Sequence, residues 1–257
     1  MTVNNIARLQ MSEAMMRLSS GKRVNSAADD AAGLAIIESM NAQIRGLDQG
    51  ERNTYDMQAM INTAEGGLDG ISDSLNRIRE LSVQALNGTN TDAQRKMIRE
   101  EISQLADSIQ DAVRNVEFNG QNLLDGSVDA ANTASGADGT GATVRINDMS
   151  GIAKAITSLA ENGSFDLAAI DSAISKVAEE RANLGALSNR MDFTASANSI
   201  SSLNLADARS RIADADIAAE KRAVEQDRVN NEIKISLQKN FQQQEKTNLQ
   251  RILNTGA

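Results

Sequence analysis

Apolar residues at alternating intervals of three and four recur through most of this chain, and they constrain its fold more than any other feature. This spacing places the apolar side chains along one stripe of a helix. It is typical of helices that pack at shallow angles in coiled coils and bundles. The packing positions are Met57, Ile61, Leu68, Ile71, Leu75 and Ile78 in a first run, Ile98, Ile102, Leu105 and Ile109 in a second, and Ile174, Val177 and Leu184 in a third.

The composition agrees with long helices joined through narrow contacts. The chain has no proline, the residue that most strongly interrupts a helix, and only 2% of its residues are aromatic. Aliphatic side chains must therefore fill the interior, which suits helix–helix contacts better than a wide core. We predict a mainly α fold: a long antiparallel helical bundle or coiled coil, with a small β-hairpin or irregular tip in the middle of the chain.

Local signals predict where the helices begin and end. Asn87-Gly88 ends the first apolar run, and Thr91-x-x-Gln94 has the spacing of a capping box that opens the next helix. Two antiparallel helices joined by a short turn follow from this pair of signals. Ser26-x-x-Asp29 has the same spacing and predicts an earlier helix start, with Asp29 in the first turn.

That earlier helix is predicted to continue through Gly46 and Gly50, each of which weakens it.

The middle of the chain has a different character. Residues 126–143 are rich in Gly, Ala, Ser, Thr and Asp, which predicts a surface loop. Residues 143–146 alternate between polar and apolar side chains, which predicts a short strand. A short helix is predicted over 149–161, and a long one from near Asp166 to about Ser210. We expect the two helical halves to pack against each other, with the middle projecting at one end.

The residue types argue against an enzyme. The chain has no His and no Cys, so it lacks the commonest general base, the commonest transition-metal ligand and any thiolate. We predict no catalytic residue, no metal site and no cofactor. Asp29-Asp30 and Asp214-x-Asp216 are interpreted as helix caps and exposed charge, and Glu100-Glu101 and Glu179-Glu180 as solvated helix faces.

The charge and the ends of the chain limit its partners. Net charge is −9, with basic residues interleaved among acidic ones, which disfavours nucleic-acid binding. No apolar run is long enough to span a bilayer, and residues 1–10 lack the apolar stretch of a secretory signal. The chain is expected to be cytoplasmic, or to be exported by a route that cleaves no signal peptide.

Five segments together resemble one known family, the bacterial flagellins. They occur in the family's order and cover both halves of the chain: Arg17–Ile36, Asn76–Gln84, Glu117–Gly126, Arg181–Arg190 and Ala208–Ile217. The resemblance implies a structural subunit of the flagellar filament that serves motility. The runner-up is a hook–filament junction protein, which shares the terminal helices. An enzyme carried on this scaffold is disfavoured, because without His there is no HExxH motif.

The resemblance also implies an organisation. Residues 1–30 and 208–257 would form the terminal helices of the filament's inner tube, and residues 31–207 a rod-like core domain with 118–165 as its hairpin or loop tip. The N-terminal part is short, because the segment before the Leu18-Ser-Ser-Gly21 loop is usually longer in flagellins. Outer domains are expected to be absent, because the middle is short.

The resemblance implies partners and a location as well. Flagellins polymerise with themselves outside the cell, after export by the flagellar type III apparatus with an export chaperone, and they meet hook-associated and cap proteins. Arg77, Leu81 and Glu101 match positions at which the innate-immune flagellin receptor binds. We expect an extracellular protein with no membrane insertion.

Overall fold

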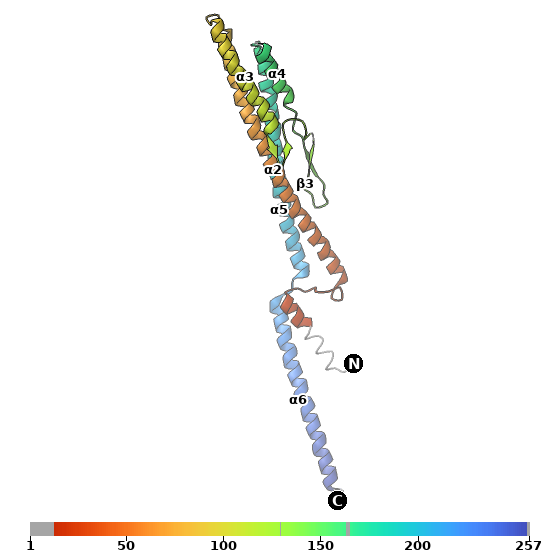
Figure 1. Cartoon of the computed structure of the whole chain (residues 1–257). Coiled ribbons are helices and arrows are strands. Elements are labelled where there is room, and N and C mark those ends of the chain that lie inside the picture. Colours follow the sequence, from red (N-terminus) through yellow and green to blue (C-terminus); the bar gives the residue numbers. More distant parts are fainter. Residues whose placement is uncertain (1–12, 129, 163–164, 256–257) are drawn as a thin grey trace. The chain divides into compact units, whose positions relative to one another are not determined.

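The computed structural model describes residues 13–128, 130–162 and 165–255, and side chains as far as residue 248. Residues 1–12 of the predicted terminal helix lie outside this part. Residues 13–20 are helical. The elements that follow (Figure 1) are α2 (Ala31–Leu86), α3 (Asp92–Asn115), β1 (Glu117–Phe118), β2 (Gln121–Asn122), β3 (Ala131–Ala134), β4 (Gly141–Val144), α4 (Ser150–Asn162), α5 (Leu167–Ala213) and α6 (Ile217–Thr255).

The predicted mainly α fold is confirmed, with two antiparallel hairpins, β1–β2 and β3–β4, in the middle of the chain. The chain forms two compact units. Residues 43–203 make the central unit, and the residues before 43 and after 203 make the terminal unit. Helices α2 and α5 contribute to both. The predicted core domain, 31–207, is thus somewhat longer than the unit that the structure delimits.

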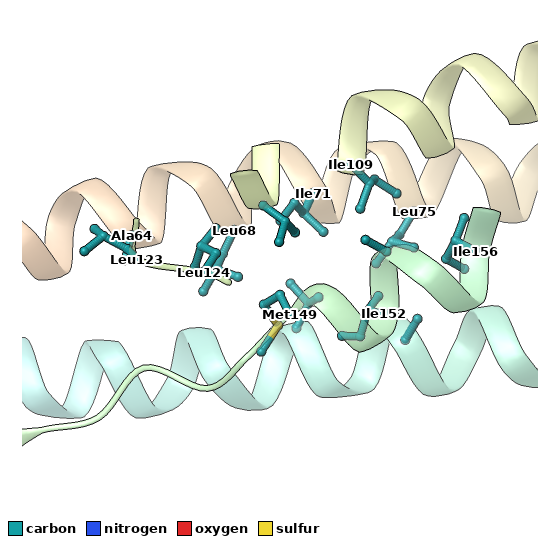
Figure 2. Close-up of a cluster of buried hydrophobic side chains, with 14 of the residues drawn as sticks. Ala64, Leu68, Ile71, Leu75, Ile109, Leu123, Leu124, Met149, Ile152 and Ile156 are labelled. Atoms are coloured by element: carbon teal, nitrogen blue, oxygen red, sulfur yellow. The ribbon is translucent and has the colours of Figure 1, made fainter. Parts of the chain in front are cut away.

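The apolar runs meet in the core of the central unit. Figure 2 shows side chains of α2, α3 and α4 turned toward one another, together with Leu123 and Leu124 from the segment after β2. All of the predicted packing positions belong to this core or pack against it, and only Leu105 and Ile174 are half-buried rather than buried. A stripe of aliphatic side chains on each helix is therefore what holds the unit together.

The turn between α2 and α3 follows the sequence signals. Helix α2 ends at Leu86, just before Asn87-Gly88, and α3 begins at Asp92. The Thr91 hydroxyl accepts a hydrogen bond from Gln94 N at 3.3 Å, while Gln94 Oε1 accepts one from Thr91 N at 2.9 Å. The predicted capping box is confirmed.

The start of α2 differs from the prediction. Residues 27–29 form a turn, and the helix begins only at Ala31, with Asp30 Oδ1 accepting a hydrogen bond from Gly33 N at 2.8 Å. The Asp29 carboxylate instead accepts from the backbone N–H groups of Ser26 and Asn25, which lower its pKa. The predicted cap at Ser26 is wrong because an aspartate can close a turn with preceding N–H groups as readily as it can occupy a helix N-terminus.

The middle of the chain holds more strand than expected. Asn119 and Gly120 both have positive φ, 51° and 75°, and they connect β1 to β2 as a two-residue hairpin turn. The predicted strand at 143–146 lies instead at Gly141–Val144. It pairs with β3, inside the segment predicted to be a loop, with Ala131 opposite Val144. The sequence did not predict β3, because its small residues carry little strand signal of their own.

The β3–β4 hairpin does not project as a tip, because its connecting loop lies against α2 and α5. Ser135 O accepts a hydrogen bond from Asn198 Nδ2 of α5 at 2.7 Å. A Cβ atom added at Gly50 of α2 would lie 2.0 Å from Ser135 O. At Gly46 it would lie 2.7 Å from Ala137 O. These two glycines, predicted only to weaken the helix, allow the backbone of the hairpin to approach it.

Replacing Gly50 with alanine is expected to destabilise the protein by about 1–3 kcal/mol, because the new methyl group overlaps backbone that cannot rotate away. Gly66→Ala in the same helix is the matched control: nothing lies within 4 Å of its added Cβ, so the better helix propensity of alanine should stabilise by about 0.5–1 kcal/mol. Urea unfolding followed by circular dichroism measures both. Shifts of the same sign would show that the hairpin does not rest on Gly50.

Candidate assembly surfaces

Residues 21–23 and 213–215, from opposite halves of the chain, pair in the terminal unit as a short antiparallel bridge. Arg23 N donates to Ala213 O at 2.6 Å, Ala215 N donates to Gly21 O at 3.0 Å, and Lys22 lies opposite Asp214. We call this pairing the terminal β-bridge. It joins two of the segments that carry the resemblance to flagellins, Arg17–Ile36 and Ala208–Ile217, although neither segment alone signals a strand.

Side chains support the terminal β-bridge. The Arg23 guanidinium donates two hydrogen bonds to Ile212 O, at 2.7 and 3.1 Å. Beside it, Val24, Ile37 and Ala213 form a small buried cluster. Where α5 gives way to α6, Asp216 Oδ1 accepts from Ala218 N and Ala219 N, at 2.9 and 3.0 Å. Asp216 therefore caps α6, in accordance with its interpretation as a helix cap.

Helix α6 carries apolar side chains that no described residue covers. Val229, Ile233, Leu237 and Phe241 are between 49% and 65% exposed. Each follows the previous one by four residues, so they advance by only about 40° per step and form one stripe along the helix. We call these four residues the α6 stripe. Exposed apolar residues that are contiguous in this way mark an interaction surface.

A second surface lies on the central unit, where α2 meets α3. Arg77 donates from Nη2 and Nε to Glu101 Oε1, at 2.8 and 3.1 Å, and from Nη1 to Glu80 at 3.2 Å. The hydrogen bonds from Glu101 and Glu80 raise the pKa of Arg77. Leu81 lies one turn along α2 but is only 2% exposed. The structure therefore brings Arg77 and Glu101 together at the surface and holds Leu81 in the core.

One acidic residue is not where the sequence suggested. Glu180 was expected on a solvated face, but it is only 1% exposed. Its Oε1 accepts a hydrogen bond from Asn147 N at 3.0 Å, and its Oε2 accepts from the Asn147 side chain. This contact fastens the segment between β4 and α4 onto α5. The expectation fails because helical periodicity cannot show which flanking segment covers a given face. Glu100 and Glu101 are exposed, as expected.

The described part of the chain holds no group of three or more acidic, His or Cys residues arranged to bind a metal ion. Within that same part, no helix combines the length and the apolar character that crossing a membrane requires.

Comparison with known protein families gives two matches, one at each end of the chain. Residues 1–129 match the bacterial flagellin N-terminal helical region, and residues 167–253 match the bacterial flagellin C-terminal helical region. Together these regions contain both segments of the terminal β-bridge and the whole α6 stripe.

Similar proteins have related names. The chain is 42% identical over 221 residues to a flagellin of Halalkalibacterium halodurans, covering 82% of this chain and 80% of the relative. It is 40% identical over 225 residues to the flagellar filament 30.7 kDa core protein of Treponema maltophilum, covering 79% of each. A putative flagellar hook-associated protein from Vibrio parahaemolyticus has a TM-score of 0.56 at 17% identity, covering 72% of this chain and all of that one, which shows a shared fold alone.

Proposed function

The chain belongs to the bacterial flagellin family, and from that premise we propose that its terminal unit supplies the surface through which copies assemble. It is a structural subunit of the flagellar filament. The observation that carries this conclusion is the pair of family regions, the N-terminal one at residues 1–129 and the C-terminal one at residues 167–253. Relatives named as filament proteins favour this role over that of a hook–filament junction protein.

The proposed mechanism is that terminal helices of neighbouring copies pack together and bury the α6 stripe. Burying apolar surface stabilises a contact by about 25 cal/mol per Å². The four exposed side chains of the stripe would add this stabilisation at every subunit of the filament. The terminal β-bridge holds the N-terminal segment beside the base of α6, so that both ends of the chain enter the same contact. In this proposal, residues 1–30 and 208–257 build the inner tube.

Electron microscopy tests the function directly. Purified protein seeded with short filament fragments should elongate them into filaments of uniform width. Monomers alone, at every protein and salt concentration tried, would contradict the role of this chain as a self-sufficient subunit.

For the route to the filament, we propose export by the flagellar type III apparatus, with an export chaperone and without cleavage of a signal peptide. Cap and hook-associated proteins would be the neighbours at the ends of the filament. The mass of the intact protein recovered from filaments tests this, because a cleaved signal would leave a chain lighter than the full sequence.

The exposed pair Arg77–Glu101 is proposed as a contact for the innate-immune flagellin receptor. Leu81 would support it from within the core rather than touch the receptor, since its side chain is buried. The two residues belong to different helices and are joined by a hydrogen bond at the surface. Truncating a single arginine in a binding surface can remove much of the affinity for the partner.

Truncating Arg77 to alanine is expected to weaken binding to the receptor ectodomain by about tenfold or more. Arg79→Ala is the control: Arg79 is similarly exposed and also ion-paired, to Asp171 at 2.6 Å, but its side chain points about 200° away around α2. Surface plasmon resonance measures both affinities. If the Arg79 variant lost as much affinity as the Arg77 variant, this face would not be the contact.

A further inference from the structure

One aromatic side chain of the central unit is directed away from the core. Phe193 of α5 is 78% exposed, whereas Met191 and Ala195, two residues to either side, are buried. Two residues turn a helix by about 200°, so Phe193 lies on the outer face. Arg190 lies one turn earlier on the same face, is exposed and forms no ion pair with a described residue. We call Arg190 and Phe193 the α5 knob.

A cavity of about 320 Å³ opens elsewhere on the same unit, between α2 and the two hairpins. Met57 and Met60 of α2 are its buried apolar residues, and Phe118 of β1 also lines it. Asp56 stands at the cavity as an exposed carboxylate and forms no ion pair with a described residue. We call this cavity the Met57 pocket.

The Met57 pocket also contains an unsatisfied polar group. Thr133 of β3 lines it and is only 3% exposed, and its Oγ1 has no hydrogen-bond partner among the described residues. Every second side chain of a strand faces the same side, and Thr133 is on the buried side of β3. A buried hydroxyl without a partner is costly, but this oxygen is itself enclosed, so it belongs to the wall of the pocket and is not open to an incoming donor.

We propose that the α5 knob of one subunit enters the Met57 pocket of a neighbouring copy. The inference rests on the filament function proposed above, and it names the surfaces on which two central units meet. Two features match. An exposed aromatic ring suits a pocket of methionines, whose sulfur atoms favour aromatic contacts, and Arg190 and Asp56 have opposite charges.

The knob and the pocket are different surfaces of one chain, so each copy offers both halves. In the proposed contact a copy inserts its knob into one neighbour and receives the knob of another, which makes the contact heterologous and lets it propagate into rings or helical filaments. Gln58 Nε2 donates to Asp192 Oδ1 at 2.7 Å, which places the segment before Phe193 level with the Met57 turn of α2. The contact therefore joins subunits that lie alongside each other.

Cysteine pairing tests the contact, because the natural chain has no Cys that would interfere. Asn132→Cys alters an exposed residue lining the pocket, and Phe193→Cys alters the knob. The two single variants are mixed, assembled on wild-type seeds and oxidised with copper phenanthroline. A disulfide needs Cα atoms roughly 4.4–6.8 Å apart, so linked dimers are expected only in assembled mixtures of both variants. Filaments without linked dimers would overturn the proposal.

Glu179→Cys mixed with Phe193→Cys is the control, because Glu179 is exposed on α5 but belongs to neither surface. Equal cross-linking in the control would also overturn the proposal. Failure of the wild-type protein to elongate seeds is a separate result and would count against the filament function itself.

A charge exchange gives an independent readout. Arg190→Glu or Asp56→Arg alone should raise the critical concentration for assembly by about tenfold, since each places like charges together. The double variant should return it to within about threefold of wild type. Single variants that assemble normally, or a double variant no better than the singles, would contradict the contact. A pocket that instead held a small molecule would give neither the cross-link nor the rescue.

Discussion

Replacing Ile233 and Leu237 together with aspartate is expected to abolish filament elongation. Both side chains belong to the α6 stripe and are about half exposed in the subunit, so the change does not remove core packing. In the assembled state the two carboxylates would lose their hydration within an apolar contact, and an unpaired buried charge costs several kcal/mol. Because the loss recurs at every subunit, we expect no filaments by negative-stain microscopy at concentrations where the wild type assembles.

The matched control is Gln238→Asp with Gln242→Asp. It adds the same charge at the same four-residue spacing on α6, but outside the stripe, and both positions are exposed. This control should still elongate seeds, and both double variants should unfold in urea at the wild-type midpoint. Loss of assembly in both would indicate that net charge, rather than the stripe, limits growth.

Replacing Leu75 with alanine is expected to lower the free energy of unfolding by about 2–5 kcal/mol. Leu75 is 0% exposed and belongs to the same buried cluster as Ile109 of α3 and Ile156 of α4 (Figure 2). The loss has two parts, the transfer energy of the removed methyl groups and the cavity left among side chains held by three helices. The chain has few large aromatic side chains that could shift into this cavity.

Leu203→Ala, at an exposed position of α5, is the comparison and should change stability by no more than about 0.5 kcal/mol. Urea unfolding followed at 222 nm measures both variants. Equal effects would show that the central core does not limit the stability of the subunit.

The helices and their packing stripes can be read from the amino-acid sequence alone. A run such as Ile61, Leu68 and Leu75 needs only the geometry of one helix to place its side chains on one side, so the pattern can be read without knowing the partner. The capping box at Thr91 is equally local.

Which residues cover each side of these helices depends on how the chain folds. Leu81 is buried, although it lies outside the main run, because α2 has neighbours on more than one side: Arg77 pairs with α3 and Arg79 with α5. Glu180 is buried because the segment at Asn147 crosses it. Gly50 allows a close backbone contact, because the loop at Ser135 folds back onto α2.

The terminal β-bridge is another feature that depends on the folded chain. Its two halves, around Lys22 and Asp214, are separated by most of the chain, and neither has strand character. Periodicity and caps report interactions within a few residues of each other. Pairings between distant segments depend on which surfaces the folded helices bring together, and only the folded chain contains that information.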